Sequence, residues 1–92
     1  MKTITMFIQQ GCPYCITARK AITDLRQENS RYADVRIQMI DENIHPDVAD
    51  QYSYYYVPSL FIDQTKCFEC MPGDDYQKIH DEIRKVMDKA CL

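Results

Sequence analysis

Residues 3–29 of this 92-residue chain, TITMFIQQGCPYCITARKAITDLRQEN, contain the clearest indication of its fold. Its first part, Thr3 to Ile8, is apolar and β-branched, and Gly11 follows it, which predicts a strand that ends in a turn. From about Pro13 to Asn29 apolar residues recur near the helical period, at Ile16, Ala18, Ile22 and Leu25. We therefore expect a strand that leads directly into a long helix.

Two cysteines, Cys12 and Cys15, lie at this strand–helix junction in the sequence Cys-Pro-Tyr-Cys. Pro13 suits the first helical position because its missing N–H would have no partner there, so Cys12 falls near the N-cap. Unpaired amides and the positive end of the helix dipole favour an anion at that position, and the thiolate is the reactive form of cysteine. The pattern predicts redox chemistry with an activated Cys12 and with Cys15 one turn further on.

Two other interpretations of these cysteines compete with redox chemistry. Cys12 and Cys15 could form a zinc site together with the second pair, Cys67 and Cys70, or they could pack as small apolar side chains. Pro-Tyr lacks the turn glycine of many zinc knuckles, and the 51 residues between the pairs hold a strand, helix and strand pattern rather than a short loop. The strand–C-x-x-C–helix context favours the redox interpretation.

Composition excludes several classes of protein. Apolar residues at 46% and charged residues at 27% are typical of a soluble globular chain, and the length predicts a single domain over residues 1–92. A net charge of −3 argues against nucleic-acid binding, and no apolar stretch reaches the ~18 residues of a membrane span. The start lacks the apolar stretch of a signal peptide, so we expect a cytoplasmic protein with mostly reduced cysteines. A monomer is expected as well.

The remainder of the chain alternates between strand and helix patterns. Strands are predicted at residues 35–40, 59–62 and 66–70, and helices at residues 46–51 and 74–89, with loops at 41–45 and 63–65. In the second strand Val35, Ile37 and Met39 would share one face. The last helix carries an apolar stripe of Tyr76, Ile79, Ile83, Val86 or Met87, and Ala90. This βαβαββα order predicts an α/β fold, a mixed four-stranded sheet flanked by three helices on its two faces.

With these motifs the chain resembles the glutaredoxin branch of the thioredoxin superfamily over its whole length. Cys-Pro-Tyr-Cys at residues 12–15 is the dithiol sequence typical of glutaredoxins. Val57-Pro58 resembles the family's Val-Pro, whose proline is cis and faces the thiols, and Gly73-Asp74-Asp75 resembles its glutathione-binding segment. The resemblance implies a thioredoxin-like fold of the glutaredoxin type.

The resemblance also implies an activity and a site. Cys12 would attack a substrate disulfide and Cys15 would resolve the mixed intermediate, with no resident cofactor or metal. Gln9 stands where glutaredoxins usually have a lysine or arginine that pairs with a glutathione carboxylate, so either glutathione or a thioredoxin reductase would be the electron donor. The partners would be protein or low-molecular-weight disulfides. Substrate or glutathione binding is assigned to Gln9, Pro13, Tyr14, Tyr56, Val57, Pro58, Gly73, Asp74 and Asp75.

The tyrosine-rich run before Val57 has two interpretations. Tyr52, Tyr54, Tyr55 and Tyr56 could form an aromatic platform for substrate, or they could pack partly buried beneath the loop with their hydroxyls in water. The second interpretation is favoured, which leaves one or two tyrosines at the groove.

The remaining cysteines and the histidines carry weaker predictions. Cys67 and Cys70, three residues apart on a strand, should face opposite sides of the sheet and not form a disulfide with each other. Cys70 is a candidate auxiliary thiol near Cys12, against the alternative of simple packing, and Cys91 should be exposed at the C-terminus. His45 is expected at a cap or turn and His80 at a surface or boundary, neither with a catalytic role.

Overall fold

The computed structural model describes residues 1–92 and confirms the predicted order of elements. The elements are β1 (Ile4–Ile8), α1 (Pro13–Glu28), the 3-10 turn η1 (Ser30–Tyr32), β2 (Ile37–Asp41), α2 (Pro46–Ala49), β3 (Ser59–Ile62), β4 (Thr65–Glu69) and α3 (Tyr76–Ala90). No helix combines the length and the apolar character needed to cross a membrane.

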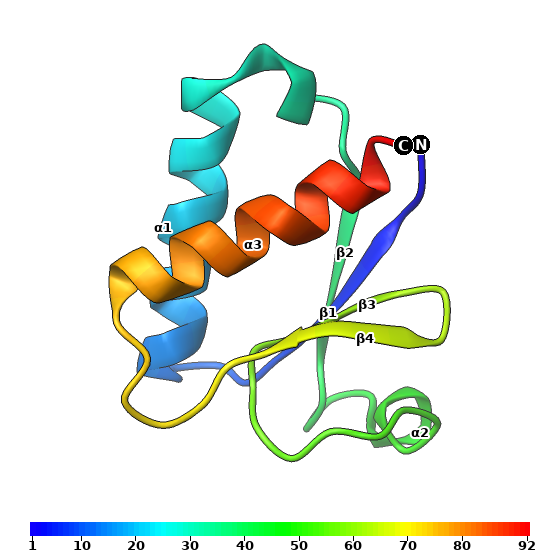
Figure 1. Ribbon diagram of the computed structural model, residues 1–92. Coiled ribbons are helices and arrows are strands. Elements are labelled where there is room, and N and C mark those ends of the chain that lie inside the picture. The colour runs from blue at the N-terminus through cyan, green and yellow to red at the C-terminus, as the bar shows by residue number, and fades with distance from the viewer.

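The four strands form one mixed sheet in the order β2-β1-β3-β4. β1 pairs parallel with β2, as the α1 crossover requires, and antiparallel with β3, which in turn forms an antiparallel hairpin with β4. Figure 1 shows α1 and α3 crossing on one side of the sheet, while α2 lies with the loops at the end where α1 begins. The sheet order places β1 at the centre, so the loop after β1 carries the dithiol between the two neighbouring strand ends.

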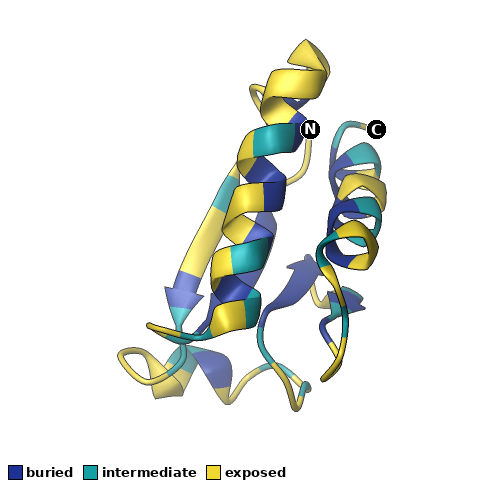
Figure 2. Cartoon of the chain, turned by 90° about the vertical axis from the view of Figure 1, so that its left-hand side faces the viewer, coloured by how far each residue is buried: buried dark blue, intermediate teal, exposed yellow.

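The main core lies between the sheet and the pair α1 and α3. Ile4, Met6 and Leu60 of the sheet are fully buried there, beneath Ile79 and Ile83 of α3. Figure 2 shows the buried faces of the two helices turned toward the sheet and toward each other. Burying a side chain of this size contributes about 1.5–3 kcal/mol, so the stripe predicted for the last helix is what fixes α3 in place.

A smaller aromatic core covers the opposite face of the sheet. Phe7 of β1 and Phe61 of β3 are buried with Ala49 of α2. The rings of Tyr52 and Tyr54 lie 4.8 and 4.9 Å from the ring of Phe7. These contacts attach the segment after α2 to the sheet and so determine the path of the chain toward Val57.

Two residues that belong to the apolar patterns of the sequence lie on the surface. Ile16 is 62% exposed, because the inward side of α1 is formed by Cys15, Ala18, Ala21, Ile22 and Leu25, which centre on roughly the opposite side of the helix from it. Met39 is 37% exposed and lies on β2, which is an edge strand of the sheet. The strand also begins at Ile37 rather than at Val35, which is nevertheless buried.

The C-terminal elements differ from the prediction at their boundaries. β4 ends at Glu69 rather than Cys70, and α3 begins at Tyr76, with Asp75 as its N-cap accepting from the amide of Lys78 at 2.9 Å. The pairing of β3 with β4 shifts register so that Cys67 is an extra, bulged residue. The bulge overturns the expectation of opposite faces, because both Cys67 and Cys70 contact the main core.

Candidate active site

Cys12 occupies the position that the sequence predicts for it. It is the N-cap of α1 in extended conformation, with φ −71° and ψ 122°, and Pro13 follows in the first turn. Its carbonyl accepts the first helical hydrogen bond from Ile16 at 3.0 Å. The Cys12 side chain makes no capping hydrogen bond, and its Sγ lies 4.0 Å from the carbonyl oxygen of Val57. Stabilisation of a Cys12 thiolate by the helix therefore stays a prediction.

The two thiols of the motif differ sharply in environment. Cys12 is partly exposed, whereas Cys15 is only 3% exposed within the main core. Burial raises the pKa of the Cys15 thiol to about 12, and the neighbouring Cys12 thiol adds to this effect. A hydrogen bond from the backbone of Gln9 lowers the Cys15 pKa but does not offset the burial. Cys15 is therefore a protonated thiol at neutral pH while Cys12 is also reduced.

The segment facing Cys12 includes Val57, whose backbone N–H and C=O make no hydrogen bond to other backbone groups. The Val57–Pro58 peptide bond is cis, as the resemblance implies. The Val57 N–H donates to no group of the protein, and its carbonyl meets only the Cys12 thiol. On the other side of the proline, the Pro58 carbonyl accepts from the amide of Cys70 at 2.9 Å. Val57 thus offers one free donor and one acceptor beside the reactive sulfur.

The loop between β4 and α3 is joined to the dithiol motif through Tyr14. The Tyr14 hydroxyl accepts from the amide of Gly73 at 2.7 Å, so two residues predicted for the site meet directly. Gly73 has a positive φ of 95°, which glycine adopts without strain. The Asp74 amide donates to the Met71 carbonyl at 3.0 Å, and the Asp74 carboxylate accepts from the Met71 amide at 2.9 Å. The amides of Gly73 and Asp74 are therefore already paired within the protein.

On the opposite side of the motif, Gln9 is held by an acidic side chain. Its amide nitrogen donates to Glu42, and Glu42 also accepts from the hydroxyl of Tyr54 at 2.7 Å. Burial and the Glu42 carboxylate raise the pKa of Tyr54. The neighbouring Asp41 accepts from the amide of Gln10 at 3.2 Å. The position that resembles a glutathione-carboxylate site thus holds an amide bound to a carboxylate.

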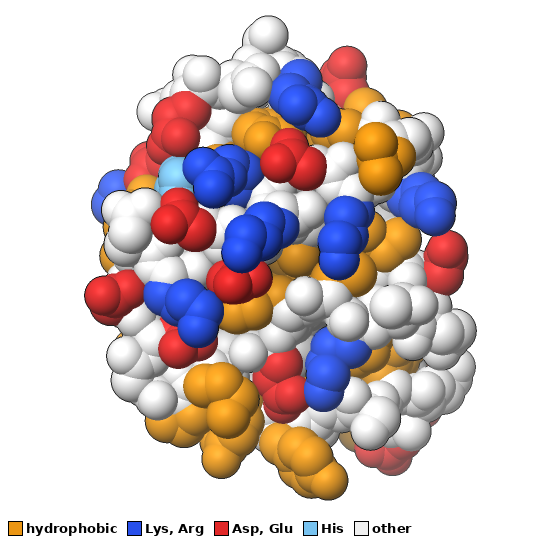
Figure 3. All heavy atoms as spheres, viewed as in Figure 1, with side chains coloured by type: hydrophobic (Ala, Val, Ile, Leu, Met, Phe, Trp, Pro, Cys, Tyr) orange, Lys and Arg blue, Asp and Glu red, His pale blue; other side chains and the backbone are white.

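The tyrosine run divides between core and surface. Tyr52 and Tyr54 pack in the aromatic core, whereas Tyr55 and Tyr56 are 90% and 44% exposed. With Met71, 49% exposed, they are the large exposed apolar residues of the two loops that follow α2 and β4. Figure 3 shows hydrophobic side chains gathered at the lower end of the molecule, where these loops and the start of α1 lie.

The other three cysteines are free thiols in separate places. Cys70 is 1% exposed and follows the end of β4, and burial, with the negative charges of Asp74 and Cys12, raises its pKa to about 11. Cys67 lines a hollow with Lys2 and Leu92, at the chain termini. The four thiols of the zinc interpretation do not converge, and no group of three or more potential ligand side chains is arranged around one point. Cys91 is half-buried rather than exposed, with its thiol 3.8 Å from the Arg31 carbonyl.

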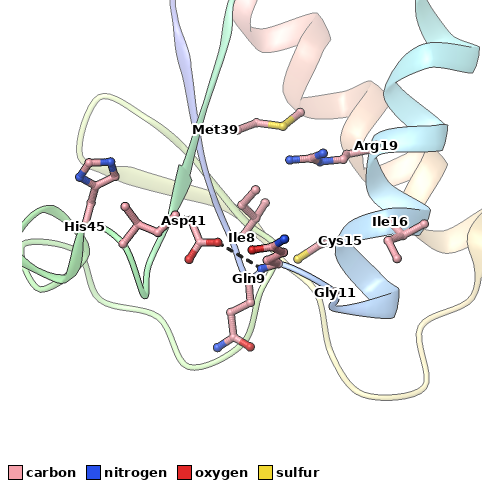
Figure 4. A pocket seen from close by; sticks show the side chains of 11 residues that line it. Ile8, Gln9, Gly11, Cys15, Ile16, Arg19, Met39, Asp41 and His45 are labelled. Carbon is pink, nitrogen blue, oxygen red and sulfur yellow. Dashed lines mark hydrogen bonds between the residues drawn. The ribbon is translucent and has the colours of Figure 1, made fainter.

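A cavity of about 460 Å³ opens beside Cys15 on the β2 side. Figure 4 shows Arg19 of α1 and Met39 of β2 extending toward each other across it, with Ile16 on the helix. His45, the N-cap residue of α2 as expected, also lines the cavity.

Sequence reasoning missed Glu42 and Glu69 as residues of this region. Glu69 is joined by hydrogen bonds to the segment before Val57, whose amides its carboxylate binds. The available signal was a single carboxylate between Phe68 and Cys70 at the end of a strand, a residue type that is depleted in strands. The signal for Glu42 was weaker, because acidic residues are common in exposed loops.

His80 is more buried than predicted, at 8% exposure. Its Nε2 lies 3.0 Å from a carboxylate oxygen of Glu28 on α1, and its Nδ1 lies 3.0 Å from Asp81. The hydrogen bond with Asp81 raises the pKa of His80, burial opposes this, and Glu28 adds to the increase. His80 therefore joins α3 to α1, away from the thiols.

Comparison with solved structures identifies the fold. The chain is similar to a malarial protein with a TM-score of 0.60 at 13% identity, over 90% of this chain and 93% of that one. It is similar to thioredoxin 1 of the thermophilic eubacterium Thermosipho africanus with a TM-score of 0.60 at 16% identity, over 98% and 99% of the two chains. At these identities the likeness establishes a thioredoxin-like fold and nothing finer.

Comparison with protein-family models identifies the family of this chain. The curated proteins gave no match to this chain. The family model described as Glutaredoxin matches residues 4–66, which include the dithiol motif and the cis-proline. That family and this fold support a function like that of thiol–disulfide oxidoreductases. With the dithiol at the start of α1 and the cis-proline opposite it, the chain belongs to the glutaredoxin family.

Proposed function

We propose that this protein is an enzyme, a cytoplasmic dithiol–disulfide oxidoreductase that contributes to redox homeostasis by reducing protein or low-molecular-weight disulfides through Cys12 and Cys15. The observation that carries the proposal is the arrangement of the thiols. Cys12 lies at the helix N-cap, partly exposed and beside the free backbone of Val57, and Cys15 lies buried one turn further on. This gives an accessible attacking sulfur and a protected resolving sulfur.

The reaction proceeds by two thiol–disulfide exchanges. The Cys12 thiolate attacks one sulfur of the substrate disulfide, forms a mixed disulfide with it, and releases the other sulfur as a thiolate. Cys15 then loses its proton and attacks the Cys12 sulfur, which releases the second substrate thiol and leaves a Cys12–Cys15 disulfide. Because the Cys12 thiol contributes to the high Cys15 pKa, forming the mixed disulfide removes part of the barrier to that deprotonation. A donor of two electrons restores the dithiol.

The Val57 backbone gives the site a means to bind polypeptide substrates. A free N–H and an accessible C=O on one residue can pair with an extended chain, as an added strand pairs with a sheet edge. The exposed side chains of Tyr56 and Met71 would contact the residues that flank the substrate cysteine. Pro13 and Tyr14 would complete the surface around the sulfur.

Specific contacts favour a second candidate function, that of an electron carrier served by a thioredoxin reductase without glutathione binding. Gln9 is bound to Glu42, so an incoming glutathione carboxylate would meet an acidic group instead of a cation. The amides of Gly73 and Asp74 already have acceptors in the Tyr14 hydroxyl and the Met71 carbonyl. Glutathione binding would have to replace these internal hydrogen bonds.

Turnover with two electron donors tests both candidates. Reduction of insulin disulfides and of hydroxyethyl disulfide is followed by NADPH oxidation, once with glutathione and glutathione reductase and once with a thioredoxin reductase. We expect turnover that Cys12→Ser abolishes and that Cys91→Ser, a matched change of a remote thiol, leaves intact. The contacts of Gln9 and Gly73 favour the reductase arm. No turnover with either donor would contradict the oxidoreductase proposal.

A further inference from the structure

The carboxylate of Glu69 binds two consecutive amides of the segment before the cis-proline. One oxygen, Oε2, accepts from the N–H of Tyr55 at 2.6 Å and from the N–H of Tyr56 at 2.7 Å. Glu69 is the last residue of β4, a rigid position paired with Ser59 of β3. A hydrogen-bonded strand end therefore fixes a stretch of loop that has no secondary structure of its own.

The contacts on either side of Val57 fix its neighbours and leave it free. The Tyr56 carbonyl accepts from the Ser59 hydroxyl at 2.5 Å, and Ser59 is fully buried. The Pro58 carbonyl accepts from the Cys70 amide at 2.9 Å. Tyr56 is thus held at both its peptide groups, Pro58 at its carbonyl, and only the Val57 donor and acceptor remain available beside Cys12.

Glu69 is placed to make these bonds as an anion. Its side chain is 13% exposed, and Oε1 accepts from Lys66 at 2.7 Å. Burial acts to raise the pKa of Glu69, but the hydrogen bonds from Lys66 and from the two loop amides outweigh it and hold the pKa below its usual range. Hydrogen bonds to an ionised acceptor are about twice as strong as those between neutral groups.

We propose that Glu69 is a positioning residue that holds the Val57 backbone in register with the dithiol for pairing with an extended polypeptide substrate. The inference rests on the proposed function, since it assigns the Val57 backbone to substrate binding. Glu69 touches neither the thiols nor the substrate, so its effect is confined to substrates long enough to pair with Val57. A disulfide too small to pair with the backbone does not depend on the loop.

The test compares Glu69→Gln with the unmodified protein on two substrates and in amide exchange. Glutamine keeps the size of the side chain but loses its charge, so kcat/KM for a peptide disulfide is expected to fall about tenfold, mainly through KM. Turnover of hydroxyethyl disulfide stays within about twofold, which also shows that the variant is folded. Hydrogen exchange of the Tyr55 and Tyr56 amides, followed by NMR, becomes about tenfold faster.

Glu82→Gln is the matched control, because Glu82 also pairs with a lysine three residues away, Lys85 at 3.5 Å, but makes no bond to the loop. We expect Glu82→Gln to leave the turnover of both substrates and the hydrogen exchange of the Tyr55 and Tyr56 amides unchanged. Unchanged exchange at Tyr55 and Tyr56 in Glu69→Gln, or equal slowing of both substrates, would overturn the positioning role. Should the unmodified protein reduce neither disulfide, the proposed function fails instead, and amide exchange alone decides the loop contact.

Discussion

At the scale of single residues, the fold gives chemically identical side chains different properties. Cys12 and Cys15 are three positions apart, yet one lies at the surface end of α1 and the other in the core. Burial keeps Cys15 protonated with a pKa of about 12, and Cys70 behaves similarly with a pKa of about 11. In the proposed mechanism, the order of attack and resolution follows from this difference in exposure.

His80 supplies a prediction about stability and pH. Its folded-state pKa is raised, first by Asp81 and also by Glu28, so the folded protein binds a proton more tightly than the unfolded chain does. The stabilisation is fully present below the ordinary histidine pKa of ~6.5 and is lost as the pH rises through the folded value. The ring of Tyr76 lies beside that of His80, with 5.7 Å between their centroids, and the Tyr76 hydroxyl donates a hydrogen bond to the carboxylate of Asp24.

We expect the free energy of unfolding to fall as the pH is raised from about 6 to 9, and His80→Gln to flatten this dependence. Urea denaturation at several pH values measures both. His45→Gln, a change at the other histidine, serves as the control and should retain the slope of the unmodified protein. If His80→Gln kept the pH dependence of the unmodified protein, the assignment of that dependence to His80 would be wrong.

At the scale of elements, the sequence predicted which segments form strands and helices but not which of their apolar residues are exposed. The strand–helix junction at Cys12 and the α3 stripe were predictable, because they follow from the dithiol motif and from local periodicity. The cis Val57–Pro58 bond was expected only because the chain resembles the glutaredoxins. The exposure of Ile16 and Met39 was not predictable, because it depends on how the helices lie on the sheet and on β2 being an edge.

The parts of the candidate site missed from sequence depend on long-range pairing. Glu69 meets Tyr55 and Tyr56, fourteen and thirteen residues away, only because the β3–β4 hairpin folds back. The bulge at Cys67 is likewise a property of the pairing between two strands, not of either strand alone. Periodicity within one segment contains no information about such contacts.

Packing of α3 on the sheet gives a prediction with an internal control. Ile83→Ala removes a fully buried side chain from the main core and should lower the free energy of unfolding by about 2–5 kcal/mol. Ile16→Ala changes the same residue type where it is 62% exposed, and should cost within about 0.5 kcal/mol. Chemical denaturation of the two variants is the measurement, and similar losses would contradict the assigned faces of α1 and α3.

At the scale of the whole molecule, charge is divided unevenly along the chain. Residues 41–75 carry eight Asp and Glu against one Lys, a formal charge of −7, whereas the remainder carries six Asp and Glu against ten Lys and Arg, +4. Residues 41–62 and 69–75 include α2 and the loops at the end of the molecule where α1 begins (Figure 1). The segments that follow β2 and β4 therefore bring a net negative charge, and with it a negative field, to their side of the dithiol.

This field should select among peptide substrates. A peptide disulfide flanked by lysines is expected to be reduced roughly tenfold faster than the same peptide flanked by glutamates at low ionic strength. The ratio should approach one at about 1 M salt, where the Debye length is ~3 Å. Uncharged hydroxyethyl disulfide, the control, should respond little to salt. Equal rates for the two peptides at low salt would show that the acidic end does not steer substrates.

Trapping the first covalent intermediate shows directly whether Cys12 is the attacking sulfur. Cys15→Ser removes the resolving thiol but leaves Cys12 at the N-cap of α1. Incubation with a peptide disulfide, followed by proteolysis and mass spectrometry, should find one peptide joined to Cys12, with an equal amount of the other peptide thiol released. A mixed disulfide on Cys67, Cys70 or Cys91 with Cys12 unmodified, or no adduct at all, would contradict the assignment of Cys12 as the attacking sulfur.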